Sequence, residues 1–223
     1  LPEGAAWNGG GPAMDALTVI FSIFAVLCAI WIVWKLVSRR KSLPCPSWLY
    51  RMVEMENPLA KNSQAKTILA GLGVAEGMTV LDAGCGPGRV TLPLGKEVGP
   101  SGKVIAVDLQ QGMLDVVQRK AQQENLVMVE FVKLPLGEGK LPPYQADRAV
   151  MAAVLGEIPQ QAAALQEVFA ALKPGGVLAI AETIFDPHYQ RKAHVLDLAQ
   201  AAGFAEVGFT GNALRYKVYL QKQ

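Results

Sequence analysis

The stretch Thr79-Val-Leu-Asp-Ala-Gly-Cys-Gly-Pro-Gly88 carries most of the information about the fold. It opens with a short apolar run, Thr79–Ala83, of the kind that forms a buried strand. Glycines follow at alternate positions, Gly84, Gly86 and Gly88. Glycines at a turn from a strand into a helix let backbone N–H groups come close to a ligand. The stretch therefore predicts a ligand-binding loop at the end of a buried strand.

An acidic residue stands at the matching place after the next apolar run. Lys103–Asp108 ends in Asp108, 20 residues beyond Gly88. A carboxylate at this position of a parallel sheet can accept hydrogen bonds from both hydroxyls of a ribose. A dinucleotide fingerprint would need glycine at position 89, where the chain has Arg89. The two positions together predict a nucleoside site that departs from the dinucleotide pattern.

Further apolar runs alternate with helical stretches along the chain. Near-continuous apolar strands between helices indicate a parallel sheet that is covered on both faces. The expected strands are 127–132, 148–154 and 177–182, and the clearest helices are 113–124 and 160–172.

The end of the chain follows a different pattern. Lys173-Pro-Gly-Gly176 is expected to turn the chain into the fifth strand. The runs 206–210 and 215–220 are separated by too few residues for a helical crossover. We expect them to form an antiparallel hairpin at the edge of the sheet.

These motifs resemble those of the class I S-adenosylmethionine-dependent methyltransferases. VLDAGCGPG at 80–88 matches the first motif of that family, and VIAVD at 104–108 matches the second. LKPGG at 172–176, followed by a strand and a terminal hairpin, matches the topology of the family's later part. The resemblance covers residues 58–223 and implies an α/β three-layer sandwich. Its seven-stranded, mostly parallel sheet would have the order 3-2-1-4-5-7-6, with strand 7 antiparallel. The implied cofactor is S-adenosyl-L-methionine, with S-adenosyl-L-homocysteine as its product, in a membrane-anchored bacterial or archaeal member.

The resemblance also implies which residues bind the cofactor. Asp82 would help to orient the methionyl ammonium, the loop glycines would let the cofactor lie against the backbone, and Asp108 would hold the ribose. Contacts near the adenine or the sulfonium are expected from Leu109, Met113, Leu134, Ala152 and Ala153. Many relatives carry an acidic residue after the third strand, but here 131–140 has no acid before Glu138. Adenine recognition is therefore left open.

Candidate residues for the methyl acceptor follow the fourth and fifth strands, because open α/β sheets bind ligands beyond the carboxyl ends of their strands. We expect Glu157, His188 and Tyr189 to contact the acceptor or to act as a base. A base is needed only where the nucleophile carries a proton when it attacks. Two structural roles stay open: Glu157 could cap the helix that starts near Pro159, and His188 could simply be solvated.

Residues 16–34, ALTVIFSIFAVLCAIWIVW, form a separate apolar stretch without any charge. As a helix it spans about 28 Å, close to the hydrocarbon thickness of a bilayer. Two tryptophans near its end are followed by four bases, Lys35, Arg39, Arg40 and Lys41. The apolar stretch predicts one transmembrane helix at 16–37 in the cell membrane. The positive-inside rule then predicts a short outer tail at 1–15 and a catalytic domain in the cytoplasm.

Two other interpretations of this stretch fit less well. A cleaved signal peptide would carry its bases before the apolar run, and a buried core helix would usually keep a polar face. Residues 1–13, ahead of Met14, have the composition of a linker and are expected to be an added leader. Residues 38–57 are expected to form a basic linker whose amphipathic helix, 48–55, lies in the membrane interface or over the globular core.

Composition limits the remaining possibilities. The net charge of +2 arises entirely from residues 1–41, whereas residues 42–223 hold 17 basic and 17 acidic residues. This balance argues against nucleic acid as a partner. Three cysteines give no disulfide framework, and His188 and His194 have no Cys/His cluster around them for a metal. The sequence implies no oligomer.

The apolar segment is the main indication of the substrate, because a tether raises the effective concentration of an acceptor in the bilayer. Our leading hypothesis is S-adenosylmethionine-dependent methyl transfer to a membrane-associated acceptor, either a lipid headgroup, a quinone or another apolar small molecule. One alternative is a methyltransferase for small apolar thiols or phenols. Another is a membrane-tethered S-adenosylmethionine-binding module without catalysis.

Overall fold

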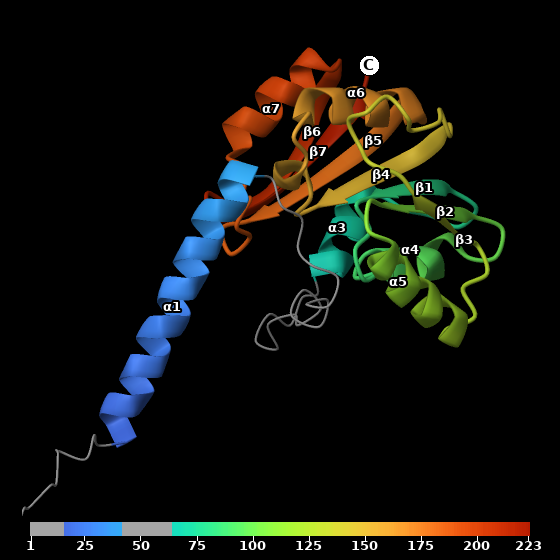
Figure 1. Ribbon diagram of the computed structural model, residues 1–223. Coiled ribbons are helices and arrows are strands. Elements are labelled where there is room, and N and C mark those ends of the chain that lie inside the picture. The colour runs from blue at the N-terminus through green and yellow to red at the C-terminus, as the bar shows by residue number, and fades with distance from the viewer. Residues whose placement is uncertain (1–15, 42–63) are drawn as a thin grey trace, which may run out of the picture.

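The computed structural model describes residues 16–41 and 64–223. Its helices and strands alternate along most of the chain and build three layers around one sheet (Figure 1). In chain order the elements are α1 (Ala16–Lys41), α3 (Gln64–Leu72), β1 (Thr79–Ala83), α4 (Thr91–Val98), β2 (Lys103–Asp108), α5 (Gln111–Gln123), β3 (Val129–Lys133), β4 (Ala146–Ala152), η2 (Leu155–Glu157), α6 (Gln161–Ala171), β5 (Leu172–Thr183), α7 (Lys192–Ala201), β6 (Phe204–Asn212) and β7 (Arg215–Lys222).

The sheet confirms the predicted topology. Its strands lie in the order β3-β2-β1-β4-β5-β7-β6. The first five strands pair in parallel, whereas β7 runs antiparallel to both β5 and β6. Parallel pairing brings the carboxyl ends of β1, β2, β4 and β5 to the same edge, so the loops after these strands can form one site.

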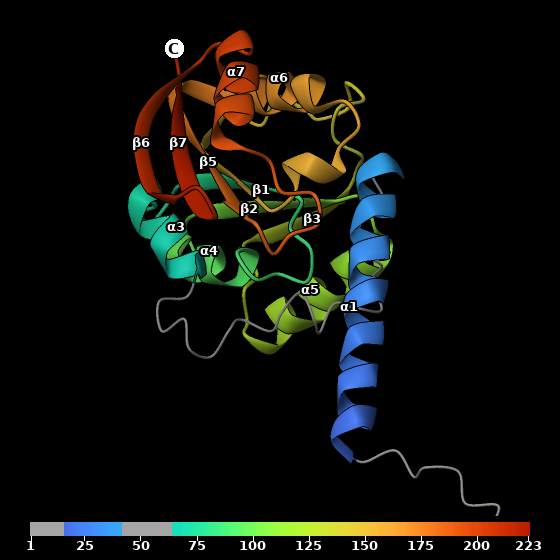
Figure 2. The ribbon, with the colours of Figure 1, turned by 90° about the vertical axis from the view of Figure 1, so that its left-hand side faces the viewer.

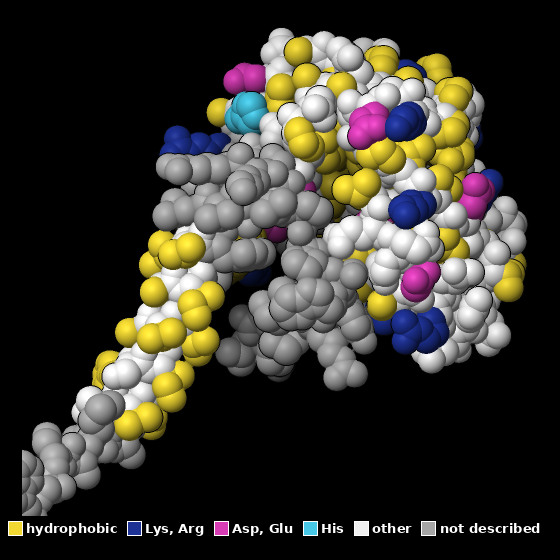
Figure 3. Space-filling view, viewed as in Figure 1, with side chains coloured by type: hydrophobic (Ala, Val, Ile, Leu, Met, Phe, Trp, Pro, Cys, Tyr) yellow, Lys and Arg dark blue, Asp and Glu magenta, His cyan; other side chains and the backbone are white. Residues whose placement is uncertain are grey.

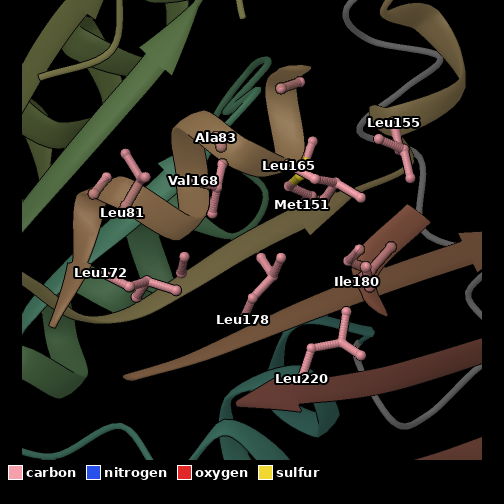
Figure 4. Close-up of a cluster of buried hydrophobic side chains, with 14 of the residues drawn as sticks. Leu81, Ala83, Met151, Leu155, Leu165, Val168, Leu172, Leu178, Ile180 and Leu220 are labelled. Carbon is pink, nitrogen blue, oxygen red and sulfur yellow. The ribbon is translucent and has the colours of Figure 1, made fainter. Parts of the chain in front are cut away.

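The helices cover both faces of the sheet, as the view in Figure 2 shows. On one face α3, α4 and α5 contribute buried side chains such as Ile68, Leu94 and Val117. On the other face α6 and α7 pack around Leu165 and Val195. Leu81, Met151, Leu178 and Ile180, on three neighbouring strands, belong to this second cluster (Figure 4). Two buried faces explain why the strand sequences are apolar almost throughout.

The predicted strand limits are correct for β1 and β2 and shifted elsewhere. β3 begins at Val129 rather than at 127, and Val127 is 88% exposed. β4 begins two residues early and ends at Ala152, because Ala153 has a left-handed backbone with φ of 58°. A residue in this conformation cannot continue a strand. The strand therefore stops two residues before the predicted end at 154.

The predicted turn at 173–176 is a bulge inside β5 and not a separate turn. Leu172 pairs with Ala146 and Val177 pairs with Arg148, so four residues of β5 stand opposite one residue of β4. Gly175 adopts a φ of 74° within this bulge. Lys173 Nζ lies 2.6 Å from Oδ1 of Asp147, the residue opposite. Pairing on both sides of the glycines keeps the segment in the sheet.

The first described helix of the globular part is held by the last strand of the sheet. The hydroxyl of Tyr219 on β7 donates to the carbonyl oxygen of Thr67 on α3 at 3.1 Å, and Lys217 Nζ donates to the Thr67 hydroxyl. Gly71 permits this approach, since a Cβ there would lie 2.1 Å from the Tyr219 hydroxyl oxygen. α3 therefore packs directly on β7.

The predicted apolar helix forms and continues to Lys41, four residues beyond the expected end. Its side chains are described at 17–30, 32 and 33, and nearly all of them are exposed. Figure 3 shows apolar side chains along its length. Within the described part of the chain, no helix has both the length and the apolar character that a membrane crossing requires. The amphipathic helix predicted at 48–55 and the tail at 1–15 lie outside the described residues.

Candidate functional site

The glycine loop after β1 is shaped by three left-handed glycines. Gly84, Gly86 and Gly88 have φ values of 87°, 50° and 93°. A Cβ on Gly84 would lie 2.4 Å from Val154, and one on Gly88 would lie 2.5 Å from Val117. A Cβ on Gly86 would meet nothing within 4 Å. Packing therefore requires the first and third glycines, whereas the second leaves open space in which a ligand can approach the backbone.

Asp108 at the end of β2 is hydrogen-bonded to this loop. Its Oδ2 accepts the N–H of Gly86 at 2.9 Å, and its Oδ1 accepts the N–H of Gln110 at 2.8 Å. Burial raises the pKa of Asp108, and these two donors oppose the shift. A carboxylate offers about four acceptor positions, so it can still receive the hydroxyls of a ribose. The arrangement fits the nucleoside part of the predicted cofactor.

Asp82 lies beneath the loop rather than at its surface. The side chain is 1% exposed, and its Oδ2 accepts the Thr91 hydroxyl at 2.6 Å. Burial raises the pKa of Asp82 to about 6, while the Thr91 hydrogen bond lowers it. Asp108 raises this pKa further and Arg89 lowers it. Asp82 is therefore placed to act on a cationic ligand through its charge. The sequence did not indicate Thr91, because a threonine nine residues after an aspartate matches no known motif.

The other predicted cofactor residues lie at or just after the ends of β2, β3 and β4 and in the first turn of α5. Leu109 is 52% exposed beside the loop, whereas Met113 is buried. The N–H of Leu134 donates to the carbonyl oxygen of Asp108 at 3.0 Å, which holds the end of β3 against the end of β2. Ala152 ends β4, and the N–H of Ala153 donates to Ala181 of β5. These positions surround the carboxyl edge on which the glycine loop opens.

Cys85 in the loop behaves as an apolar residue, as its position predicts. It is 5% exposed and belongs to the core beneath α4 and α5. Burial, and then the nearby charges of Asp82 and Asp108, raise the pKa of its thiol. A thiol in this state stays protonated and is a poor nucleophile.

The predicted acceptor-side residues come together after β4 and β5. His188 Nδ1 lies 3.8 Å from Oε1 of Glu157 and 3.9 Å from Oδ1 of Asp186. His188 is 4% exposed, so the interpretation of a solvated histidine is wrong. Glu157 lies in η2 and does not cap α6, which begins at Gln161 without a side-chain cap.

Tyr189 has a structural role in addition to its place beside this cluster. Its hydroxyl donates to the carbonyl oxygen of Ala213 at 2.6 Å, and its ring packs edge-on against Tyr216. Burial, and then the charge of Glu182, raise the pKa of Tyr189. A hydroxyl that is bound in this way anchors the loop after β5 to the hairpin turn. It is less available to an acceptor than the prediction assumed.

Glu182 ends β5 in a buried position. It is 1% exposed, and its Oε2 accepts the N–H of Gln190 at 3.1 Å, whereas Oε1 has no hydrogen-bond partner in the described residues. Burial raises the pKa of Glu182 to about 8, although the Gln190 N–H lowers it. The charges of Asp186 and Glu157 raise it further. Glu182 thus keeps its proton at neutral pH.

A pocket of about 540 Å³ opens beside His188. It lies between the segment that follows β4 and the loop that follows β5. Its lining residues are Gly156, Ile158, Pro159, Gln161, Ile184, His188, Tyr189, Gln190, Arg191 and His194. Sequence reasoning identified two of them as site residues. It missed Gln161, Arg191 and His194, because a residue at a helix start or in a loop carries no periodic signal.

Comparisons with known proteins agree with this geometry. Residues 80–176 match the family model described as a methyltransferase domain. Demethylmenaquinone methyltransferase of Lactobacillus johnsonii is 35% identical over 126 residues, which are 55% of this chain and 51% of that protein. The enzyme of the same name from Lactococcus lactis is 34% identical over 125 residues, 54% of this chain and 47% of that protein. The chain thus matches about half the length of these curated relatives.

Solved structures share the fold. A SAM-dependent methyltransferase from Aquifex aeolicus superposes with a TM-score of 0.72 at 24% identity, covering 81% of this chain and 100% of that one. The cyclase SpnF superposes with a TM-score of 0.63 at 15% identity, covering 71% of this chain and 79% of that one. A cyclase among the neighbours illustrates that this fold alone does not determine the reaction.

Proposed function

From the S-adenosylmethionine-dependent methyltransferase domain that this chain carries, we propose that the protein methylates an apolar, hydroxyl-bearing ring of the quinone type at a membrane. The observation that carries the proposal is the cofactor half of the site: an open loop at Gly86 joined by a hydrogen bond to Asp108. Relatives named demethylmenaquinone methyltransferase support the class of acceptor.

The cofactor residues act by position and charge. Gly86 offers open backbone, Asp108 offers acceptors for the ribose, and Asp82 offers a buried negative charge for the ammonium. S-adenosylmethionine, when bound, supplies a methyl group activated by a positively charged sulfur. Holding the reacting atoms in line supplies much of the rate of such a displacement. We propose that Leu109, Met113, Leu134, Ala152 and Ala153 complete the walls of the cofactor site.

Helix α1 is the feature that supports a location at the membrane. Most of its described side chains are apolar and exposed, and the helix ends in Arg39, Arg40 and Lys41. Exposed apolar side chains followed by bases favour a bilayer partner, with the catalytic domain on the cytoplasmic side. An acceptor dissolved in the bilayer would then meet the site at a high local concentration.

The test follows a labelled methyl group to its acceptor. The full chain is placed in phospholipid vesicles that hold demethylmenaquinone reduced to its quinol, and methyl-deuterated S-adenosylmethionine is added. Mass spectrometry is expected to find the label on the quinol, and Asp108→Ala is expected to abolish it. Label on the phospholipid headgroup, or only on an added thiol such as thiocresol, would refute the quinone proposal. Cofactor binding without transfer to any of these would point to a binding module.

The predicted orientation has its own test. Sealed cells that express the full chain are treated with a membrane-impermeant amine reagent. We expect lysines of the folded domain, such as Lys173, to react only after the cells are opened. Equal labelling of intact and opened cells would place the domain outside.

A further inference from the structure

His188 is a buried polar side chain that makes no side-chain hydrogen bond within the described residues. It is 4% exposed, and neither ring nitrogen has a hydrogen-bond partner among the described residues. The nearest charged atoms are Glu157 Oε1 at 3.8 Å and Asp186 Oδ1 at 3.9 Å from Nδ1. Buried polar groups are nearly always paired, so an unpaired one calls for an explanation such as a ligand.

The backbone around His188 is fixed on several sides. Its N–H donates to Asp186 Oδ1 at 2.6 Å, and its carbonyl oxygen accepts from Gln190 Nε2 at 2.7 Å. Gly156 in η2 lies so close that a Cβ there would be 1.9 Å from this carbonyl oxygen. The hydroxyl of Tyr216 on β7 donates to the Gln190 carbonyl oxygen at 2.9 Å. The fold therefore fixes the backbone that carries the imidazole.

The pocket beside His188 combines a few apolar walls with several polar side chains. Ile158, Pro159 and Ile184 give it apolar walls, and Gln161, Arg191 and His194 add polar groups. His194 Nε2 lies 2.9 Å from Oε1 of Gln161, which links the two sides of the polar part. A volume of about 540 Å³ is within the range of small-molecule sites.

The pocket also adjoins the carboxyl edge of the sheet. Gly156 follows Ala153 by three residues, and the N–H of Ala153 donates to Ala181, next to Glu182. The segments after β4 and β5 that line the pocket therefore leave the sheet at its carboxyl edge, where open α/β sheets bind ligands.

We propose that this pocket binds the hydroxyl-bearing ring of the methyl acceptor, and that His188 accepts the hydroxyl proton while Glu157 positions the imidazole. The proposal rests on the function proposed above and names its acceptor site. In this step the acceptor O–H bond breaks, the proton bonds to a ring nitrogen of His188, and the electron pair stays on the oxygen. That pair, or the ring carbon to which it delocalises, bonds to the methyl group as the methyl–sulfur bond breaks and its electrons stay on the sulfur. On the carbon route the ring C–H bond then breaks, its proton leaves to solvent, and the imidazolium returns its proton to the oxygen.

The charges around His188 suit this step. A neutral imidazole can accept at one nitrogen while it donates at the other, and Glu157 lies on the Nδ1 side. The imidazolium that forms would stand between the carboxylates of Glu157 and Asp186. Arg191 lines the same pocket and offers a positive charge to the oxygen that loses its proton.

The first test measures binding without turnover. The full chain in detergent micelles is labelled with ¹³C on its two histidines, His188 and His194, and titrated with 1-naphthol or with its methyl ether, 1-methoxynaphthalene. We expect naphthol to shift the His188 signal and to bind about tenfold tighter than the ether. His194→Asn serves to assign the second signal. A His188 signal that neither compound moves would overturn the pocket assignment.

The second test separates proton transfer from structure. We expect His188→Asn and His188→Gln to lower kcat for the quinol about 100-fold, within the usual range for a general base, while S-adenosylhomocysteine binds as in the wild type. Glu157→Gln should lower kcat and leave naphthol affinity within about twofold. Unchanged turnover in a folded His188 variant refutes this inference and leaves the proposed function standing. If the wild-type protein does not bind S-adenosylhomocysteine, the proposed function itself is refuted.

Discussion

The backbone N–H of Gly86 donates a hydrogen bond of 2.9 Å to Oδ2 of Asp108, which ends the neighbouring strand. This bond ties the open glycine of the loop to the proposed ribose acceptor, so the two halves of a nucleoside site are set relative to each other before any ligand binds. Such preorganisation lowers the ordering cost of binding.

Removing the Asp108 carboxylate is therefore expected to weaken cofactor binding. Asp108→Ala removes the proposed acceptors for the ribose and the bond that holds Gly86. We expect S-adenosylhomocysteine to bind at least about 100-fold more weakly by calorimetry, because two hydrogen bonds to a charged group are lost. Asp115→Ala, on the exposed side of α5, is the matched control. Equal affinities of Asp108→Ala and wild type would place the ribose elsewhere.

Alanine substitutions at two glycines of the loop are expected to have different effects, one on stability and the other on cofactor binding. Gly84→Ala would push a Cβ to 2.4 Å from Val154, so we expect a loss of roughly 2–4 kcal/mol in unfolding free energy. Gly86→Ala meets open space and should cost the fold only about 1 kcal/mol. If a ligand lies over Gly86, this second variant should still lose S-adenosylhomocysteine binding at least about tenfold. Thermal unfolding and calorimetry of both variants test the distinction, and normal binding by Gly86→Ala would contradict it.

Cofactor affinity is expected to fall in mild acid through Asp82. Its pKa is raised to about 6, mainly by burial, so the negative charge disappears as the pH drops through that value. We expect S-adenosylhomocysteine, with its ammonium group, to bind about tenfold more weakly near pH 5 than near pH 7.5, an effect of about 1.4 kcal/mol. Asp82→Asn should bind S-adenosylhomocysteine weakly at both pH values, and its affinity should depend less on pH. A wild-type affinity that stays constant across this range would remove Asp82 from the ammonium site.

Stability is expected to fall with rising pH through Glu182. Its pKa is 4.5 in an unfolded chain and about 8 in the fold, where burial disfavours the charge. Between these values the folded state keeps a proton that the unfolded state has lost, so raising the pH favours unfolding. The loss amounts to on the order of 5 kcal/mol across this window. Glu182→Gln, which stays neutral, should show a flatter profile of unfolding temperature, whereas Glu206→Gln at the surface should follow the wild type.

The parts of the fold that could be predicted are those that local sequence determines. The runs that became β1 and β2 are apolar, short and closed by Gly84 and Asp108, and their limits were correct. The bulge at 173–176 could not be predicted from the sequence, because Lys-Pro-Gly-Gly has the composition of a turn. Pairing on both sides of it, of Leu172 with Ala146 and of Val177 with Arg148 and Gln221, keeps it in the sheet.

The site followed the same division. Asp108 could be found from its place at the end of an apolar run. The burial of His188 could not, because Asp-Pro-His-Tyr has the composition of an exposed loop. Its burial depends on Gly156, 32 residues earlier, which lets the segment after β4 come close. Residues such as Thr91 and Gln190 act through partners that tertiary structure alone supplies.

The position of β7 between β5 and β6 has a consequence for how the domain folds during synthesis. Among the described strands β6 pairs with β7 alone, and Tyr219 and Lys217 of β7 also hold Thr67 of α3. A nascent chain that has emerged as far as Asn212 therefore has an unpaired strand, an open edge on β5 and a helix without its support. These long-range contacts, 150 or more residues apart in sequence, form late and slowly. Completion of the domain must wait for β7, and until then the exposed edges are available to chaperones or to aggregation.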